Sequence, residues 1–374
     1  MNTNTNEGRS LQALAGMHAP CCSRRRFMGV FSGLAAAAAL PGCQHVPAVS
    51  TEPGAVGAAG AAAVGSRIDV HHHFFSPKWV QAVEKRNALQ PVLGFDHFKN
   101  WTLDRDIEVL DRDGVEKAYL SVTQPGVWFG DVKESAYLAR DLNEHGAGMK
   151  EKRKGRYGLF AVLPLPDMDA TLREIEYAFD VLKADGVGLL SSYDDKWLGD
   201  PSFAPMWKEL NRRKAVVYVH ATAPGCCSWN YQPGVLPTIV ELSSDLARAM
   251  VSLVHNGVAN ATPDVRFIWS HGGGSIWAQR FLVGETVQSL AQEAPLNSRL
   301  HHFRRFYYDT AAAADAVHMG ILKMIVPHSQ ILFGSDYPWV EPARIAKGLE
   351  QSGFTADELK AIYRTNALKM LARK

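Results

Sequence analysis

The sequence lacks an excess of charge of either sign, because 40 lysines and arginines face 38 aspartates and glutamates for a formal net charge of +2. A chain balanced in this way offers no broad basic surface, which excludes nucleic acid as its partner. Internal repeats are absent, and no apolar segment is long enough for a permanent transmembrane helix. The 47% share of hydrophobic residues is typical instead of a soluble globular protein.

Cysteine is scarce as well, with five in the whole chain. Cys21, Cys22 and Cys43 lie in the N-terminal leader. The other two, Cys226 and Cys227, are neighbours, and neighbours rarely bridge each other because a disulfide requires a particular separation of the α-carbons. The folded body is therefore predicted to have no disulfide framework.

The leader, residues 1–43, carries signs of export. The run Ser23-Arg24-Arg25-Arg26-Phe27-Met28 fits the twin-arginine pattern, and a short apolar stretch follows over residues 30–40. Leu40-Pro41-Gly42-Cys43 resembles a lipobox, which would make Cys43 a lipid anchor. Residues 44–66 read as a flexible linker. We predict twin-arginine export to the periplasm, as a free or membrane-anchored protein; a disordered arginine-rich leader is the alternative.

From residue 67 onward, short β-branched or aromatic runs alternate with amphipathic segments such as residues 169–184. Eight strands are predicted, over residues 67–71, 116–122, 157–163, 186–191, 214–220, 265–271, 305–310 and 330–335. Apolar strands joined by helices indicate a parallel sheet. Eight such units in residues 67–374 match an α/β protein of the (β/α)₈ TIM-barrel type. An open doubly wound sheet lacks support, because no Gly-x-Gly-x-x-Gly turn follows the first strand.

Side chains that bind cations or move protons stand at the ends of these strands. His71 and His73 end the first strand, and His220 ends the fifth. His271 ends the sixth strand and Asp336 the eighth. The carboxyl ends of barrel strands converge at one mouth, where the active sites of such barrels lie. The pattern therefore predicts an enzyme with one shared site.

The first strand suggests a metal centre. Side chains two apart in a strand point the same way, so His71 and His73 can hold one ion while His72 packs or hydrogen-bonds elsewhere. His220 and Asp336 complete the predicted ligand set. Three imidazoles and one carboxylate favour Zn²⁺, with Mn²⁺ as the alternative. The fourth strand ends without a lysine or glutamate that would bridge a second ion, so one metal ion is predicted.

His271 opens the run His271-Gly272-Gly273-Gly274-Ser275. Its glycines let the backbone approach a ligand, and an imidazole titrates near neutral pH. We predict that His271 is a general acid/base. A fourth imidazole ligand or a hydrogen-bonded structural histidine are the alternatives. Asp336 is expected to move a proton besides binding the metal.

Aromatic side chains gather in the loops predicted at the same mouth. We expect them to offer a flat pocket for an aromatic ring, or else to fill the top of the barrel. They are Phe74, Phe75, Trp128, Phe129, Trp229, Tyr337 and Trp339.

In these motifs the chain resembles the amidohydrolase-2 family of metal-dependent barrel enzymes, the relatives of aminocarboxymuconate-semialdehyde decarboxylase. The resemblance covers residues 67–374. It rests on Ile68–Phe74, the strand that ends in His220, His271–Gly274 and Gly334–Pro338. Residues 158–166 and 185–190 are similar to the 6-methylsalicylate decarboxylase branch.

The resemblance implies the ligands already named and His271 as the catalytic acid/base. It also implies the non-oxidative loss of CO₂ from a small aromatic or unsaturated carboxylic acid, and a homodimer. Some family decarboxylases hold a carboxylate with an arginine shortly before the second barrel helix, where this chain offers only Lys99. A lysine is a point charge and a weaker anchor than the arginine fork.

Two other functions stay open. A metal-dependent hydrolase would use the same site, with His271 as base, to cleave a lactone, ester or amide. A non-catalytic zinc-binding lipoprotein of the periplasm would need the ligands alone. The proton-transfer pair of His271 and Asp336 argues against that second alternative.

Overall fold

The computed structural model describes residues 66–89, 92, 94–223, 236–279 and 292–372. These residues belong to one compact unit, Gly60–Lys374. The predicted export signal with Cys43, the linker up to residue 65, Cys226, Cys227 and Trp229 lie outside the described residues. No helix in the described ranges combines the length and the apolar character needed to cross a bilayer.

Eight parallel strands form one sheet in the order β1-β2-β3-β4-β7-β8-β9-β10. They are β1 Arg67–His73, β2 Val115–Ser121, β3 Tyr157–Val162, β4 Gly186–Leu190, β7 Val216–His220, β8 Arg266–Trp269, β9 Tyr307–Asp309 and β10 Ile331–Leu332. The last strand returns to the first, because the N–H of Val70 donates to the carbonyl of Phe333 at 3.0 Å and the N–H of Asp336 to that of His71 at 2.9 Å. The predicted (β/α)₈ barrel is confirmed.

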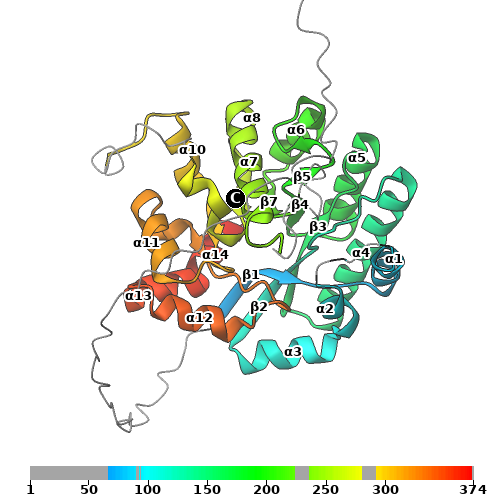
Figure 1. Cartoon of the computed structure of the whole chain (residues 1–374), viewed down its shortest axis with the longest axis horizontal. Coiled ribbons are helices and arrows are strands. Elements are labelled where there is room, and N and C mark those ends of the chain that lie inside the picture. Colours follow the sequence, from blue (N-terminus) through cyan, green and yellow to red (C-terminus); the bar gives the residue numbers. More distant parts are fainter. Residues whose placement is uncertain (1–65, 90–91, 93, 224–235, 280–291, 373–374) are drawn as a thin grey trace, which may run out of the picture. The chain divides into compact units, whose positions relative to one another are not determined.

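Helices surround these strands in chain order (Figure 1). They are α1 Pro77–Asn87, α2 Phe95–Asn100, α3 Leu103–Arg112, α4 Val132–Lys152, α5 Met168–Glu176, α6 Ala204–Arg212, α7 Glu241–His255, α8 Val258–Ala261, α10 Arg299–Arg305, α11 Ala316–Ile325, α12 Pro342–Glu350, α13 Ala356–Lys360 and α14 Asn366–Leu371. A small antiparallel pair, β5 Ser192–Tyr193 and β6 Lys196–Trp197, follows β4.

The segment predicted to be helical over residues 169–184 illustrates how these crossovers form. Asp167 begins α5 by accepting the N–H of Ala170 at 3.2 Å, as an N-cap aspartate does. The helix continues through one π-helical turn, Tyr177–Val181. Ile175 and Ala178 are fully buried on the face turned to the sheet, which then resumes in β4.

The inside of the barrel is filled by side chains. Tyr119, Phe160 and Tyr218 stack across it, with ring centroids 5.2 and 5.7 Å apart. The ring of Tyr218 lies 5.3 Å from that of His71, so the stack lies directly against the predicted metal site. From α14, Met370 belongs to the same buried cluster.

The strands before His271 and Asp336 are shorter than predicted. β8 ends at Trp269, so His271 lies beyond this strand and is not its last residue. β10 ends at Leu332, so Asp336 lies further from its strand than the predicted end at residue 335 implied. Both residues have left-handed backbones, with φ of 52° and 69°. Residues other than glycine rarely adopt this conformation, and it turns the chain out of the ladder at the mouth of the barrel.

His302 should make the barrel less stable in mild acid. The buried ring accepts the Nε–H of Arg305 at Nδ1 (3.2 Å) and contacts the Oδ1 of Asn260 through Nε2 (2.7 Å). Burial, with Arg305 nearby, lowers the pKa of His302 to about 4. Below the usual pKa of about 6.5 the unfolded chain binds a proton that the folded chain refuses, so stability falls as the pH falls toward 4.

The variant His302→Gln should therefore lose less stability than the parent between pH 7 and pH 5, by about 1–2 kcal/mol in denaturant unfolding. Its control is His328→Gln, which replaces an exposed ring and should keep the parent's pH dependence. An unchanged pH dependence in His302→Gln would contradict the prediction.

Candidate metal centre and its cavity

The alternation of β1 brings His71 and His73 to one side of the strand. Both rings are fully buried, and their Nε2 atoms lie 3.0 Å apart. Their Nδ1 atoms have partners of their own: Asp309 Oδ2 at 2.8 Å for His71 and the Ser121 carbonyl at 3.1 Å for His73. Because those partners accept hydrogen bonds, a neutral ring at either position carries its proton on Nδ1 and keeps its Nε2 lone pair for a metal ion.

His220 and Asp336 complete the group. The Oδ1 of Asp336 lies 3.1 Å from His71 Nε2 and 3.0 Å from His73 Nε2. His220 contacts the carbonyl of Ala221 through Nδ1 at 2.6 Å, while its buried Nε2 has no hydrogen-bond partner. One ligand atom from each of these four residues lies within 4.8 Å of the others.

These donors fit a divalent cation. Three imidazole lone pairs and a carboxylate oxygen in a buried site are the ligands such an ion needs, and a cation would satisfy the orphaned Nε2 of His220. Burial and the rings of His73 and His71 hold the pKa of His220 well below its ordinary value, which keeps it neutral. The four residues form a divalent metal site, and no second such cluster occurs within the described ranges.

His72 points away from this site. Its Nδ1 lies 3.2 Å from Asp69 and its Nε2 2.8 Å from Asp106, and its ring stacks on that of Tyr337 at 5.1 Å. Asp69 also accepts the N–H of Ser335 at 3.0 Å. The face of β1 opposite the metal site thus fastens the segment that carries Asp336.

His271 stands beside the four ligands without joining them. Its ring centroid is 5.0 Å from that of His71 and 5.4 Å from that of His220. Its backbone N–H donates to Asp309 at 2.9 Å, while its buried Nδ1 has no partner. Burial lowers the pKa of His271, so the ring is neutral near pH 7 and able to accept a proton.

The turn that begins at His271 is η3, His271–Ala278, and its three glycines all have positive φ. Gly274 has φ 61° and ψ −138°, a combination that is essentially restricted to glycine. A Cβ there would lie 2.6 Å from the carbonyl oxygen of Ser243 in α7. This close approach lets α7 and η3 pack together around His271.

Gly274→Ala should therefore destabilise the protein by about 2–3 kcal/mol and reduce turnover, because both the strain and the contact displace the turn. The matched control is Gly148→Ala in α4, where the added Cβ meets no atom within 4 Å. That control should gain about 0.5–1 kcal/mol of stability from the higher helix propensity of alanine. Denaturant unfolding of both variants makes the test, and equal stabilities would refute it.

The site opens into a cavity of about 270 Å³. This is near the lower end of the roughly 300–1,000 Å³ typical of small-molecule sites, so a single ring is the expected size of ligand. His220, His271 and Asp336 line one part of the cavity. The rest of its lining is mixed, with apolar Ile239, Leu242, Ala312 and Trp339 and polar Thr123, Gln124, Ser243 and His318.

Most of the aromatic residues named from the sequence do not line this cavity, which favours the alternative that they fill the barrel, and Lys99 lies outside the cavity too. Of the aromatic residues predicted to line it, only Trp339 among the described ones does so. Phe74 and Phe75 are buried in the core instead, and Tyr337 stacks on His72. Lys99 lies on α2 with its ammonium 3.8 Å from Glu84, on an outer groove. No lysine or arginine lines the cavity within the described part of the chain.

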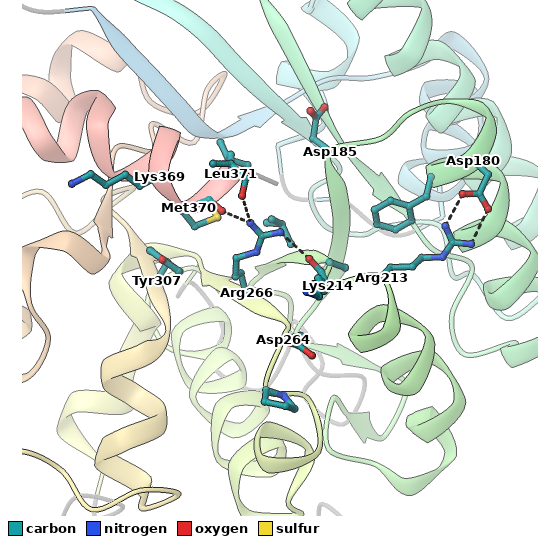
Figure 2. A pocket seen from close by; sticks show the side chains of 15 residues that line it. Asp180, Asp185, Arg213, Lys214, Asp264, Arg266, Tyr307, Lys369, Met370 and Leu371 are labelled. Carbon is teal, nitrogen blue, oxygen red and sulfur yellow. Dashed lines mark hydrogen bonds and ion pairs between the residues drawn. The ribbon is translucent and has the colours of Figure 1, made fainter. Parts of the chain in front are cut away.

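A larger pocket, of about 550 Å³, lies where β7, β8 and β9 begin, at the opposite end of the strands from the metal site (Figure 2). Its two arginines bind other groups of the chain. Arg213 pairs with Asp180 at 2.7 Å, and Arg266 donates to the carbonyls of Met370 at 2.5 Å and Lys214 at 2.8 Å. This pocket lies at the base of the barrel, and its described lining residues form no metal-binding cluster.

The sequence reasoning missed Asp309, at the end of β9. Its carboxylate is fully buried and contacts both a metal ligand and the backbone of His271. The available signal was its place directly after the run Phe306-Tyr307-Tyr308, which is a strand end like the others. A single aspartate after such a run is also common at the start of a loop, so position alone does not distinguish it.

The chain is similar to proteins of known activity and structure. The chain is 33% identical to decarboxylase yanB of Aspergillus niger over 329 residues, 82% of this chain and 88% of that protein. It is also 33% identical to the 6-methylsalicylic acid decarboxylase of Penicillium expansum over 283 residues, 73% of this chain and 85% of that protein. A crystal structure of a dihydroxybenzoic acid decarboxylase from Polaromonas sp. JS666, with bound manganese, superposes with a TM-score of 0.70 at 18% identity, covering 82% of this chain and 97% of that one.

The amidohydrolase family profile matches residues 68–373, which include all eight barrel strands except Arg67 at the start of β1, and all the site residues described above. By this match, and by relatives a third identical over most of their length, the chain belongs to the amidohydrolase family.

Proposed function

We propose that the protein is a metal-dependent decarboxylase that removes CO₂, without oxidation, from a small aromatic carboxylic acid. The observation that carries this proposal is a His₃Asp site that opens into a ring-sized cavity, which the imidazole of His271 also lines. The relatives at 33% identity are decarboxylases, which supports the same class of reaction for this chain.

His71, His73, His220 and Asp336 would hold one ion. We propose Zn²⁺, because three imidazoles and one carboxylate at a compact site suit it best, with Mn²⁺ as the alternative. When bound, the ion would act as a Lewis acid that draws the substrate's carboxylate or a neighbouring hydroxyl into place. Metal analysis of the purified protein decides between the two ions.

The proton balance assigns a task to His271. Decarboxylation breaks the bond between the ring carbon and the carboxylate, releases CO₂ and leaves an electron pair that a proton must take up. His271 lines the cavity, and its imidazole, once protonated, can deliver that proton to the ring carbon. Asp336 also lines the cavity, so its carboxylate is able to take part in the transfer.

The walls of the cavity indicate the kind of substrate. Trp339 and Leu242 offer apolar contact for a ring, while Thr123 and Gln124 offer hydrogen bonds to a hydroxyl or carboxylate. A monocyclic acid with one polar substituent matches both walls and the volume of about 270 Å³.

One observation favours a hydrolase as the second candidate. The described lining has no lysine or arginine to pair with a carboxylate, and a neutral lactone, ester or amide needs none. In that case His271 would act as a base toward water.

The test that separates the two is a mass-spectrometric screen of the metal-loaded protein against hydroxybenzoates and lactones in ¹⁸O-labelled water. We expect a hydroxybenzoate to lose 44 mass units as CO₂ is released. Incorporation of ¹⁸O into a ring-opened acid, with no CO₂ from any acid, would replace this proposal with the hydrolase. Export by the twin-arginine route, a lipid anchor at Cys43 and a homodimer stay predictions.

A further inference from the structure

The carboxylate of Asp309 lies between the metal site and the turn that carries His271. It is fully buried, and its two oxygens have different partners. Oδ2 accepts from His71 Nδ1 at 2.8 Å. Oδ1 accepts the backbone N–H groups of His271 at 2.9 Å and Ala311 at 3.0 Å.

The first oxygen decides how His71 can bind a cation. A carboxylate only accepts, so the proton of a neutral His71 must sit on Nδ1. The lone pair then lies on Nε2, which faces His73 Nε2 at 3.0 Å and Asp336 Oδ1 at 3.1 Å. Without Asp309, a neutral His71 could carry its proton on either ring nitrogen. With the proton on Nε2, the ring would have no lone pair there to bind the metal.

The second oxygen decides where His271 stands. The residue has φ 52°, which costs free energy for a side chain with a Cβ. The bond from its N–H to Oδ1 offsets that cost at the first residue of η3. The same oxygen ties the turn to Ala311, next to Asp309 itself.

We infer that Asp309 is a positioning residue that serves both halves of the site: one oxygen fixes the metal-binding tautomer of His71 and the other holds the backbone of His271. The inference rests on the metal site of the proposed function, but not on the reaction that the site catalyses. Its first test can therefore be made without any substrate.

Asp309→Asn is the sharpest variant. The two backbone N–H groups select the amide oxygen, so the new NH₂ group faces His71 and donates to Nδ1. His71 must then carry its proton on Nε2, where it opposes metal binding. We expect the affinity for Zn²⁺, measured by competition with a chromophoric chelator, to fall by about 10–100-fold. Thermal unfolding of the metal-free variant checks that it folds.

Asp245→Asn is the matched control. Asp245 is an equally buried aspartate, on α7, and accepts from Ser191, Ser192 and Trp197 at 2.6–2.7 Å, none of which is a metal ligand. Its variant should bind Zn²⁺ as tightly as the parent. Equal losses in both variants would mean that any buried charge is needed, and the inference would fall.

A double-mutant cycle tests the route through His71. If Asp309 acts through that ring, then His71→Ala with Asp309→Asn should bind Zn²⁺ no more weakly than His71→Ala alone. Additive losses overturn the assignment. Should Asp309→Asn fail to fold, the tautomer of His71 in the parent is read from its imidazole ¹⁵N shifts. A proton on Nε2 of His71 in the metal-free protein at high pH would also overturn the assignment.

The oxygen that holds His271 is tested by comparing Asp309→Asn with Asp309→Ala at saturating metal. The amide keeps the acceptor for the His271 N–H, whereas alanine removes it. Turnover per bound ion should be at least tenfold lower in Asp309→Ala, with the larger change in kcat and not in KM. Equal turnover in the two variants refutes this half. If no substrate is turned over by the parent, the proposed function fails while the metal-binding result stands on its own.

Discussion

Replacing His271 with alanine should lower turnover of an accepted acid by about 10²–10⁴-fold, the usual contribution of a general acid or base. The ring lies 5.0 Å from His71 between centroids, yet it is outside the four-ligand group. Its Nδ1 is buried without a partner, so the structure gives this nitrogen no stabilising task. The His271 side chain also lines the cavity beside the metal site, where a substrate would lie.

The metal content separates a proton-transfer role from a ligand role. In His271→Ala the bound ion should stay at the parent's stoichiometry, because none of the four ligands is touched. His255→Ala, which removes an exposed imidazole at the end of α7, is the control and should keep full turnover. Loss of the ion in His271→Ala would instead make His271 a fifth ligand. Full turnover with the ion retained would show that His271 takes no part in the reaction.

The joint replacement of His71 and His73 by alanine should have an even larger effect. Both Nε2 atoms of the pair lie within about 3 Å of the Asp336 carboxylate, so the double variant loses half of the ligand set. We expect bound metal to drop from about one ion per chain to less than about 0.1, with turnover lost in parallel. Elemental analysis after gel filtration gives the stoichiometry directly.

A second double variant, at two exposed histidines, is the control for this result. His255→Ala combined with His328→Ala removes two exposed imidazoles and should leave the metal content unchanged. Zn²⁺ added to the His71→Ala, His73→Ala protein should restore no turnover. Unaltered metal content in that double variant would falsify the ligand assignment.

Much of this site could be predicted from strand alternation alone. A period of two places His71 and His73 on one side of β1 and His72 on the other, and the structure has them so. The end of β7 likewise locates His220. These predictions worked because a buried parallel strand leaves few choices of register, and a barrel brings all strand ends to one mouth.

Other features depend on contacts that sequence position does not reveal. The left-handed backbones of His271 and Asp336 are held by Asp309 and by the closure onto β1, over long distances in sequence. The sequence position of Lys99 likewise does not reveal that its ammonium lies 3.8 Å from Glu84 and away from the cavity. The role of Asp309 appears only when its two oxygens are seen with their partners.

The stacked rings inside the barrel fill the space below the metal site. Phe160 and Tyr218 are fully buried, and the edge of that stack lies against His71. Packing of this density leaves no room for a substrate to reach the ion from below. Among the described residues, the cavity of about 270 Å³ is the opening beside the ion, so reactant, released gas and ring product would share it. A bulky side chain introduced at Leu242 in the wall of this cavity would slow both entry and release, and would leave the bond-breaking step itself unaltered.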